Sequence, residues 1–169
     1  MKQLSELLSA TAVVQFVTAA DPEIGALEYD SRKIKAGDCF FAVCGTQSDG
    51  HNYIASAIES GAVAVVCQTL PQQLNESVSY IVVEDSNKAM ADMAAAFYDY
   101  PSEELELVGV TGTNGKTTIA TLLYELFRKM GHRCGLLSTV CNYIDGTPYP
   151  STHTTPDAIS LNRLLAQMV

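Results

Sequence analysis

One segment of the chain, Val110–Thr118 (VTGTNGKTT), has the residue types and order of a phosphate-binding loop. Gly112 and Gly115 let the backbone turn tightly and direct its N–H groups toward an anion. A helix that begins near Lys116 adds the positive end of its dipole. In such a loop the lysine ammonium reaches the β- and γ-phosphates of a nucleotide, and the Thr117 hydroxyl can bind Mg²⁺. The sequence therefore predicts a site for nucleotide phosphates.

The loop departs from the strict pattern at one position. Val110 stands where the first glycine is expected, and Gly109 comes one residue too early. A Gly-Lys-Thr turn can also be purely structural, so the neighbouring elements decide between the two interpretations. The apolar run Leu105–Val110 predicts a strand that leads into the loop, and the residues after the loop have helical periodicity. The order of strand, loop and helix favours the nucleotide site.

The helix after the loop has the clearest periodicity in the chain and ends at Gly131. Its apolar face is expected to belong to the core, and it consists of Ile119, Leu122, Leu123, Leu126, Phe127 and Met130. Residues Cys134–Ser138 predict the next strand, parallel to the one before the loop through a right-handed crossover. A last helix is expected to open at Thr155–Asp157, with Thr155 as its N-cap and Pro156 in its first position.

The residues before the loop alternate between strand and helix patterns. Strands are expected at residues 26–29, 39–43, 62–66 and 80–83, and a short helix at 4–8. Asp49 can cap a helix that Gly61 ends, and Ser86 can cap another that stops before Pro101. The fold class is therefore α/β. We expect a small N-terminal α/β domain at residues 1–85, followed at 86–169 by the start of a P-loop parallel-sheet domain.

Composition limits the classes of function. The formal net charge of −9 argues against a nucleic-acid or anionic-membrane partner, because such surfaces require clustered Lys and Arg. The apolar segment Ala10–Ala20 lacks the basic start of a secretory signal, and no run reaches transmembrane length. The five cysteines form no Cys-x-x-Cys pair and share no ligand spacing with the histidines. This predicts reduced thiols in a cytoplasmic protein rather than disulfides or a zinc site.

The loop is expected to need an acidic Mg²⁺ partner at the end of a later strand. After Lys116 the only carboxylates are Glu125, Asp145 and Asp157, and none of them follows a hydrophobic strand. Two strands are also too few to cover a nucleotide-binding helix in a sheet with two buried faces. We therefore expect the sequence to be a fragment that stops inside its second domain and is inactive by itself.

Several stretches, taken together and in order, resemble the Mur ligases, which build the peptide stem of peptidoglycan. They are Asp30-Ser31-Arg32, Gly37–Val43, Asp49-Gly50-His51, the loop Gly112–Thr118, and Thr154-Thr155-Pro156-Asp157. The loop and the last segment resemble the MurE branch, which adds the third residue of the stem. The MurF branch shares the style of the first domain and remains the nearest alternative.

The resemblance implies an ATP-dependent, amide-forming ligase with ATP and Mg²⁺ as cofactors. In such an enzyme ATP phosphorylates the terminal carboxylate of UDP-N-acetylmuramoyl-L-Ala-D-Glu. The amine of a diamino acid, diaminopimelate or lysine, then attacks the acyl phosphate. The implied partners are these two substrates. The resemblance also implies a monomeric protein that binds neither nucleic acid nor a membrane.

The resemblance also implies site residues. The ATP-binding residues are Gly112, Thr113, Asn114, Gly115, Lys116, Thr117 and Thr118, with Lys116 catalytic and Thr117 on Mg²⁺. The UDP-substrate-binding residues are Tyr29, Ser31, Thr46, Gln47, Ser48, His153, Thr154 and Thr155. Asp30-Ser31-Arg32 can also be an ordinary turn with a surface ion pair, and Asp49-Gly50-His51 only a turn with a helix cap.

Two readings from other classes remain open at the level of sequence. A regulatory GTPase requires a guanine-reading Asn-Lys-x-Asp, whereas the only Asn-Lys here, Asn87-Lys88, continues with Ala-Met and precedes the loop. A non-catalytic nucleotide-binding module, specific for UDP-sugars, would share the same loops without completing a reaction.

Overall fold

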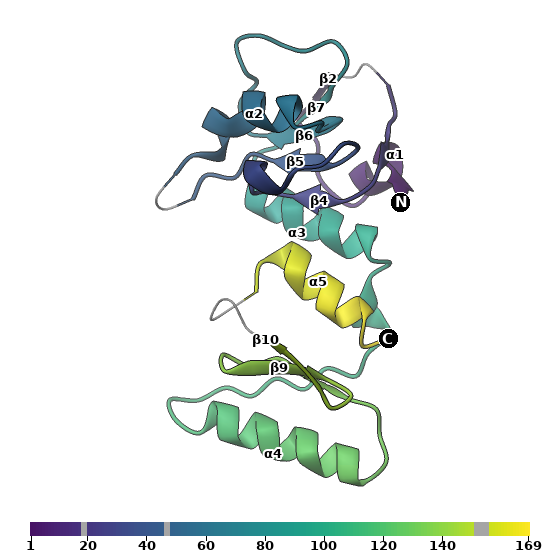
Figure 1. Ribbon diagram of the computed structural model, residues 1–169, viewed down its shortest axis with the longest axis vertical. Coiled ribbons are helices and arrows are strands. Elements are labelled where there is room, and N and C mark those ends of the chain that lie inside the picture. Colours follow the sequence, from purple (N-terminus) through teal and green to yellow (C-terminus); the bar gives the residue numbers. More distant parts are fainter. Residues whose placement is uncertain (18–19, 46–47, 151–155) are drawn as a thin grey trace. The chain divides into compact units, whose positions relative to one another are not determined.

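The computed structural model describes residues 1–17, 20–45, 48–150 and 156–169 (Figure 1). The chain forms two compact units, Met1–Phe97 and Tyr98–Val169. Each unit is described by itself below. Among the described residues, no helix has the length and the apolar character needed to cross a membrane.

The first unit is built on a five-stranded sheet of order β2-β7-β6-β5-β4. Its strands are β2 (Gln15–Val17), β4 (Leu27–Glu28), β5 (Cys39–Phe41), β6 (Ala64–Cys67) and β7 (Ser79–Val82). Strands β4 to β7 are parallel, and β2 joins β7 antiparallel at the edge. A separate antiparallel pair is formed by β1 (Lys2–Gln3) and β3 (Glu23–Ile24). This arrangement confirms the α/β fold class.

Helices cover both faces of this sheet. Helix α2 (Ile54–Glu59) lies over one face, and α1 (Leu4–Leu8) and α3 (Ser86–Phe97) lie over the other, as Figure 1 shows. Successive residues of a strand are therefore all buried. Phe40 packs with Ile54 and Val65 on the α2 side, and its neighbour Phe41 is buried to the same extent. Burial on both sides explains why these strands are continuously apolar. The expected helix at 4–8 is confirmed, and so are the four expected strands, with bounds that differ by up to two residues.

Helix α3 differs from expectation at its start. The Asp85 carboxylate accepts hydrogen bonds from the Asn87 N–H (2.8 Å) and the Lys88 N–H (3.1 Å), so Asp85 is the cap and not Ser86. A carboxylate is the stronger acceptor for these helix-end N–H groups. The Ser86 hydroxyl is buried without a hydrogen-bond partner. Because α3 contacts α1 and β6, the compact unit continues past Asp85 to Phe97; the functional domain boundary near residue 85 stays a prediction.

The second unit contains two helices and an antiparallel sheet of order β10-β9-β8. Its elements are η3 (Pro101–Glu103), α4 (Lys116–Lys129), β8 (Gly135–Leu136), β9 (Cys141–Ile144), β10 (Thr147–Pro150) and α5 (Ala158–Ala166). The β9–β10 hairpin turns at Asp145 and Gly146, which both have positive φ (44° and 91°). An Asp-Gly pair is favoured at such a turn because glycine adopts positive φ without strain.

The expected parallel crossover in the second unit is wrong. No strand forms at 105–110, where Leu107 and Val108 are exposed, and β8 pairs antiparallel with β9. A strand exists only with a pairing partner, and within the described part of the chain none lies beside residues 105–110. The short loop after β8 makes the antiparallel pairing accessible instead. The helix α5 begins at Ala158 with Asp157 as its cap, accepting from the Ser160 N–H at 2.8 Å.

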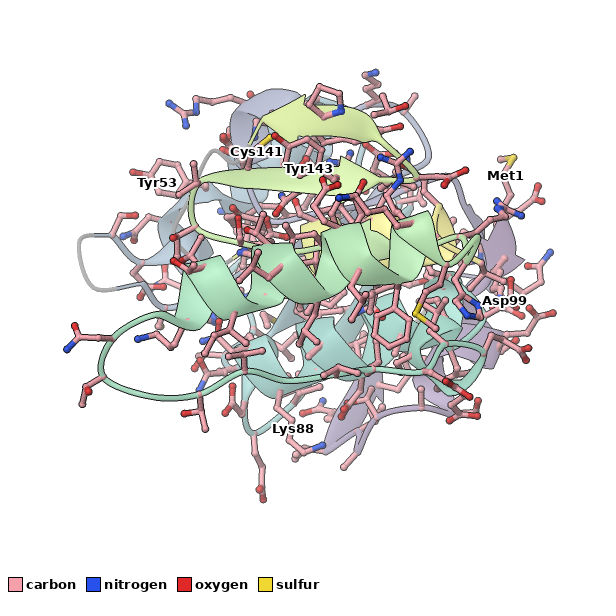
Figure 2. The ribbon with its side chains drawn as sticks, turned by 90° about the horizontal axis from the view of Figure 1, so that it is seen from below. Met1, Tyr53, Lys88, Asp99, Cys141 and Tyr143 are labelled. Carbon is pink, nitrogen blue, oxygen red and sulfur yellow. The ribbon has the colours of Figure 1, made fainter. Side chains whose placement is uncertain are left out.

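The apolar face of α4 is also not in the core. Ile119, Leu122, Leu126, Phe127 and Met130 are all exposed, contrary to expectation. The helix packs instead through Tyr124, which lies against Tyr143 of β9 with ring centroids 5.7 Å apart. Figure 2 labels Tyr143 on this strand. The Tyr124 hydroxyl accepts a hydrogen bond from the Gly146 N–H at 2.8 Å, and Arg128 stacks over the Tyr124 ring. Among the described residues of the second unit there is no parallel sheet that could cover the apolar face.

Candidate functional site

The phosphate-loop residues take the conformation that the sequence predicts at the start of α4. Gly115 is the N-cap residue with φ of 78°, and Gly112 has φ of 146°. The helix begins at Lys116, and the Ile119 N–H closes its first turn on the Gly115 carbonyl at 2.9 Å. The positive φ values explain why glycine occupies both positions. The helix N-terminus therefore faces the loop, as an anion site requires.

Lys116 folds back over this loop. Its Nζ donates to the Gly112 carbonyl at 2.6 Å and lies 3.5 Å from the Thr113 carbonyl. The ammonium is thus held at the loop rather than extended into solvent. A phosphate oxygen is a stronger, charged acceptor than a carbonyl, so Lys116 can exchange one partner for the other with a small movement. Thr117, in the first turn of α4, is partly buried, while Thr113, Asn114 and Thr118 are exposed.

Other predicted site residues lie at the carboxyl-terminal edge of the sheet in the first unit. Strands β4, β5, β6 and β7 are parallel, so the segments that follow them meet at one edge. Ligands of open α/β sheets bind at this edge. Tyr29 and Ser31 follow β4, and Ser48 lies in the turn after β5. Thr46, Gln47, His153, Thr154 and Thr155 lie outside the described residues.

The segment after β4 is a tight turn. The Asp30 carboxylate accepts from the Arg32 N–H at 3.2 Å and from the Arg32 side chain at 2.8 Å through both Nε and a terminal nitrogen. These bonds, led by the side-chain pair, hold the pKa of Asp30 below its usual value. Ser31 opens the short helix η1 (Ser31–Lys33). The Asp-Ser-Arg motif therefore does form a turn with a surface ion pair, which leaves Ser31 at the sheet edge.

The turn after β5 is closed by backbone contacts at its base. Cys44 and Asp49 form a β-bridge, and the Gly45 N–H donates to the Ser48 carbonyl at 2.9 Å. The Gly50 N–H donates to the Val43 carbonyl at 2.9 Å. Ser48 is exposed near the tip. The described residues 44–45 and 48–49 are called the β5 turn.

A cluster of ionisable side chains stands beside the β5 turn. The Asp49 carboxylate accepts from the His51 N–H (2.9 Å), lies 2.6 Å from the His51 ring Nδ1, and accepts from the Cys44 thiol (3.3 Å). The two bonds from His51 lower the pKa of Asp49, and the bond to Asp49 raises the pKa of the Cys44 thiol. With Ile54, Gln68, Thr69, Leu70 and Pro71, these residues line a hollow of about 410 Å³.

His51 reaches across to the end of β6 with its other ring nitrogen. The Gln68 N–H donates to His51 Nε2 at 3.0 Å, and the Thr69 N–H lies 3.4 Å from the same atom. Because Nε2 accepts, the ring hydrogen is on Nδ1 and is donated to Asp49. The sequence predicted Asp49 as the cap of the helix that carries Ile54, whereas Asp49 caps the short helix Gly50–Tyr53 before it. Cys44, Gln68 and Thr69 were missed, since contacts between separate strand ends leave no local pattern.

The same cluster has the residue types of a metal site. Ligand atoms of Cys44, Asp49 and His51 all lie within 4.8 Å of one another, the one such group of three among the described residues. A metal on Nδ1 would move the ring hydrogen to Nε2, where it would face the N–H groups of Gln68 and Thr69. The hydrogen bonds therefore favour a neutral polar network over a bound cation.

Comparison with known proteins identifies the family of this chain. Residues 110–169 match the Mur ligase middle domain, and residues 23–98 match the catalytic domain of the Mur ligase family. The chain belongs to the Mur ligase family. The expected UDP residues 29, 31 and 46–48 lie inside the second match, and the phosphate loop lies inside the first.

Curated relatives of this Mur ligase chain are named UDP-N-acetylmuramoyl-L-alanyl-D-glutamate--2,6-diaminopimelate ligase. The relative from Bacteroides fragilis is 54% identical over 98% of this chain and 34% of its own length. Those from Cytophaga hutchinsonii and Geobacillus thermodenitrificans are 51% and 42% identical over 99% of this chain. The chain spans about a third of the length of these relatives. The resemblance to the MurE branch is thereby confirmed.

The chain is also similar to solved structures of Mur ligases. A UDP-N-acetylmuramoyl-L-alanyl-D-glutamate--2,6-diaminopimelate ligase is 30% identical with a TM-score of 0.67, over 86% of this chain and 29% of the other. A MurF structure from Acinetobacter baumannii is 20% identical with a TM-score of 0.65, over 98% of this chain and 33% of the other. The second likeness concerns the fold alone.

Proposed function

We propose that this chain is part of an ATP-dependent, amide-forming ligase of peptidoglycan precursor synthesis. The enzyme would add 2,6-diaminopimelate, or a related diamino acid such as lysine, to UDP-N-acetylmuramoyl-L-Ala-D-Glu through an acyl phosphate. The observation that carries the proposal is the loop Gly112–Thr118 at the N-terminus of α4, inside the Mur middle-domain match. The names of the relatives support the substrate class.

The loop residues would act by holding and neutralising phosphate. The N–H groups at the start of α4 and the helix dipole would bind the phosphates of ATP, with Gly112 and Gly115 keeping the backbone open. Lys116 would leave the Gly112 carbonyl and neutralise charge on the transferring phosphoryl group. Thr117 fits a Mg²⁺ ligand because its side chain stands in the first helical turn. Mg²⁺ would supply Lewis-acid neutralisation of phosphate charge.

The sheet edge of the first unit would hold the UDP end of the substrate. Small hydroxyls and backbone N–H groups at Tyr29, Ser31 and residues 46–48 suit uracil and diphosphate oxygens. His153, Thr154 and Thr155 would contact the substrate near the γ-phosphate. We further propose a monomeric, cytoplasmic protein. The chain itself, at a third of its relatives' length, would bind ligands without completing the reaction.

Calorimetry on the 169-residue chain tests both halves of the proposal. UDP-N-acetylmuramoyl-L-Ala-D-Glu should bind, and Ser31→Ala should weaken it by about fivefold through loss of one hydrogen bond. Mg²⁺-ATP should bind, and Lys116→Ala should reduce that affinity by about tenfold or more, as loss of a charge-assisted bond requires. Equal affinity for UMP and GMP, unaffected by Ser31→Ala, would overturn the UDP assignment.

A further inference from the structure

We infer that His51 is a positioning residue for the UDP end of the site, which it holds in shape by joining the β5 turn to the end of β6. The inference rests on the proposed function, because Ser48, an expected UDP contact, lies in the β5 turn. His51 itself is not required to touch the substrate. Its role follows from a continuous chain of hydrogen bonds along the carboxyl-terminal edge of the sheet.

The first part of this chain fixes the β5 turn to His51. Asp49 closes the turn through its bridge to Cys44, and its carboxylate accepts from both the backbone N–H and the ring of His51. Gly50 lies so close to Val43 that an added Cβ would stand 2.6 Å from the Val43 nitrogen. The two residues on either side of Gly50 therefore have little freedom to move.

The second part joins His51 to the end of β6, which Gln68 in turn joins to the end of β7. Its Nε2 accepts from the Gln68 and Thr69 N–H groups directly after β6. The Gln68 side chain then donates to the Glu84 carbonyl after β7 at 2.9 Å. The ends of β5, β6 and β7 are thus connected by side-chain bonds as well as by the sheet. Without the imidazole acceptor, the N–H groups after β6 would lose this partner, and the β5 turn would lose its side-chain link to them.

The alternative is that the network stabilises the fold and has no effect on UDP binding. Two conservative variants separate the alternatives. In His51→Asn the amide can still donate to Asp49 from the position of Nδ1, but nothing reaches Gln68. In His51→Gln the amide oxygen takes the position of Nε2 and can accept from Gln68 and Thr69, while the bond to Asp49 is lost. Ser60→Ala, which removes a bond to the Ser56 carbonyl at the end of α2, is the matched control for stability.

The test measures UDP affinity by calorimetry, the melting temperature, and amide hydrogen exchange at Gln68 and Thr69. His51→Asn should weaken UDP binding by about fivefold and speed exchange at both amides, because one shared acceptor is lost. His51→Gln should stay within about twofold of wild type, and Mg²⁺-ATP affinity should change in neither variant. Ser60→Ala should lower the melting temperature without changing UDP affinity.

The outcomes distinguish this inference from the proposed function. The positioning role alone would be overturned if wild type binds UDP and neither His51 variant alters that affinity, although amide exchange at Gln68 is faster in His51→Asn. Equal weakening by His51→Asn and His51→Gln would also overturn it, since the link to β6 would not be the operative bond. Failure of the wild-type chain to bind UDP would overturn the proposed UDP site, and the positioning role with it.

Discussion

The two long helices of the chain, α3 and α4, have similar sequence patterns and different environments. Both have apolar residues at helical spacing. Helix α3 buries Ala89, Met93 and Ala94 against the first unit, whereas α4 leaves Leu122 and Leu126 exposed and packs through Tyr124. The comparison teaches that periodicity predicts an apolar face but does not determine what covers it. In the first unit the covering sheet is complete within the described residues.

The largest expected effect tests burial in the two units directly. Phe40→Ala, in the fully buried centre of the first sheet, should cost about 3–5 kcal/mol of unfolding free energy through lost burial and a cavity. Leu122→Ala, on the exposed face of α4, should change stability by less than about 0.5 kcal/mol. Amide hydrogen exchange in β6 and in α4 measures each unit separately. A cost above about 2 kcal/mol for Leu122→Ala would show that the α4 face is covered.

The next effect concerns backbone approach rather than side-chain burial. A Cβ at Gly50 would meet the Val43 nitrogen at 2.6 Å and its carbonyl oxygen at 2.8 Å. Since neither backbone atom can move freely, Gly50→Ala should destabilise the first unit by about 1–3 kcal/mol. Gly109→Ala is the matched control, because a Cβ there meets nothing within 4 Å. Equal melting temperatures for the two variants would contradict the close approach at Gly50.

The sequence predicted best where an element depends on its own residues. The glycine-rich loop and the start of α4 at Lys116 are local, and the structure has them as expected. Asp49 is also a cap, but of the short helix Gly50–Tyr53 that precedes α2 rather than of α2 itself. Residues 105–110 were wrongly expected as a strand because a strand requires a partner that its own apolar run cannot reveal. The contact of His51 with Gln68 was missed for the same reason, since it joins residues far apart in the sequence.

A smaller effect tests the contact that holds α4 in the second unit. Tyr124→Phe removes the hydroxyl that accepts from the Gly146 N–H, while the ring contact with Tyr143 remains. Loss of this one bond should cost about 1 kcal/mol and speed exchange of the Gly146 amide. Tyr100→Phe, at an exposed tyrosine of the same unit, is the control. An unchanged Gly146 amide in Tyr124→Phe would contradict the packing of α4 through its tyrosine face.

The smallest effect is electrostatic and distinguishes the sheet edge from the rest of the first unit. The pKa values of Asp30 and Asp49 are both lowered, chiefly by bonds from Arg32 and His51 respectively. A carboxyl whose pKa is lower in the folded state stabilises the fold above its unfolded value of about 3.9, and this contribution disappears as the pH falls through the folded pKa. Acid below about pH 4 should therefore weaken wild type more than Asp30→Asn, which has no carboxyl to titrate there. Amide exchange near residues 30–33 against pH measures the difference. Parallel curves for the two proteins would mean that the Asp30–Arg32 pair, exposed on the arginine side, contributes nothing to stability.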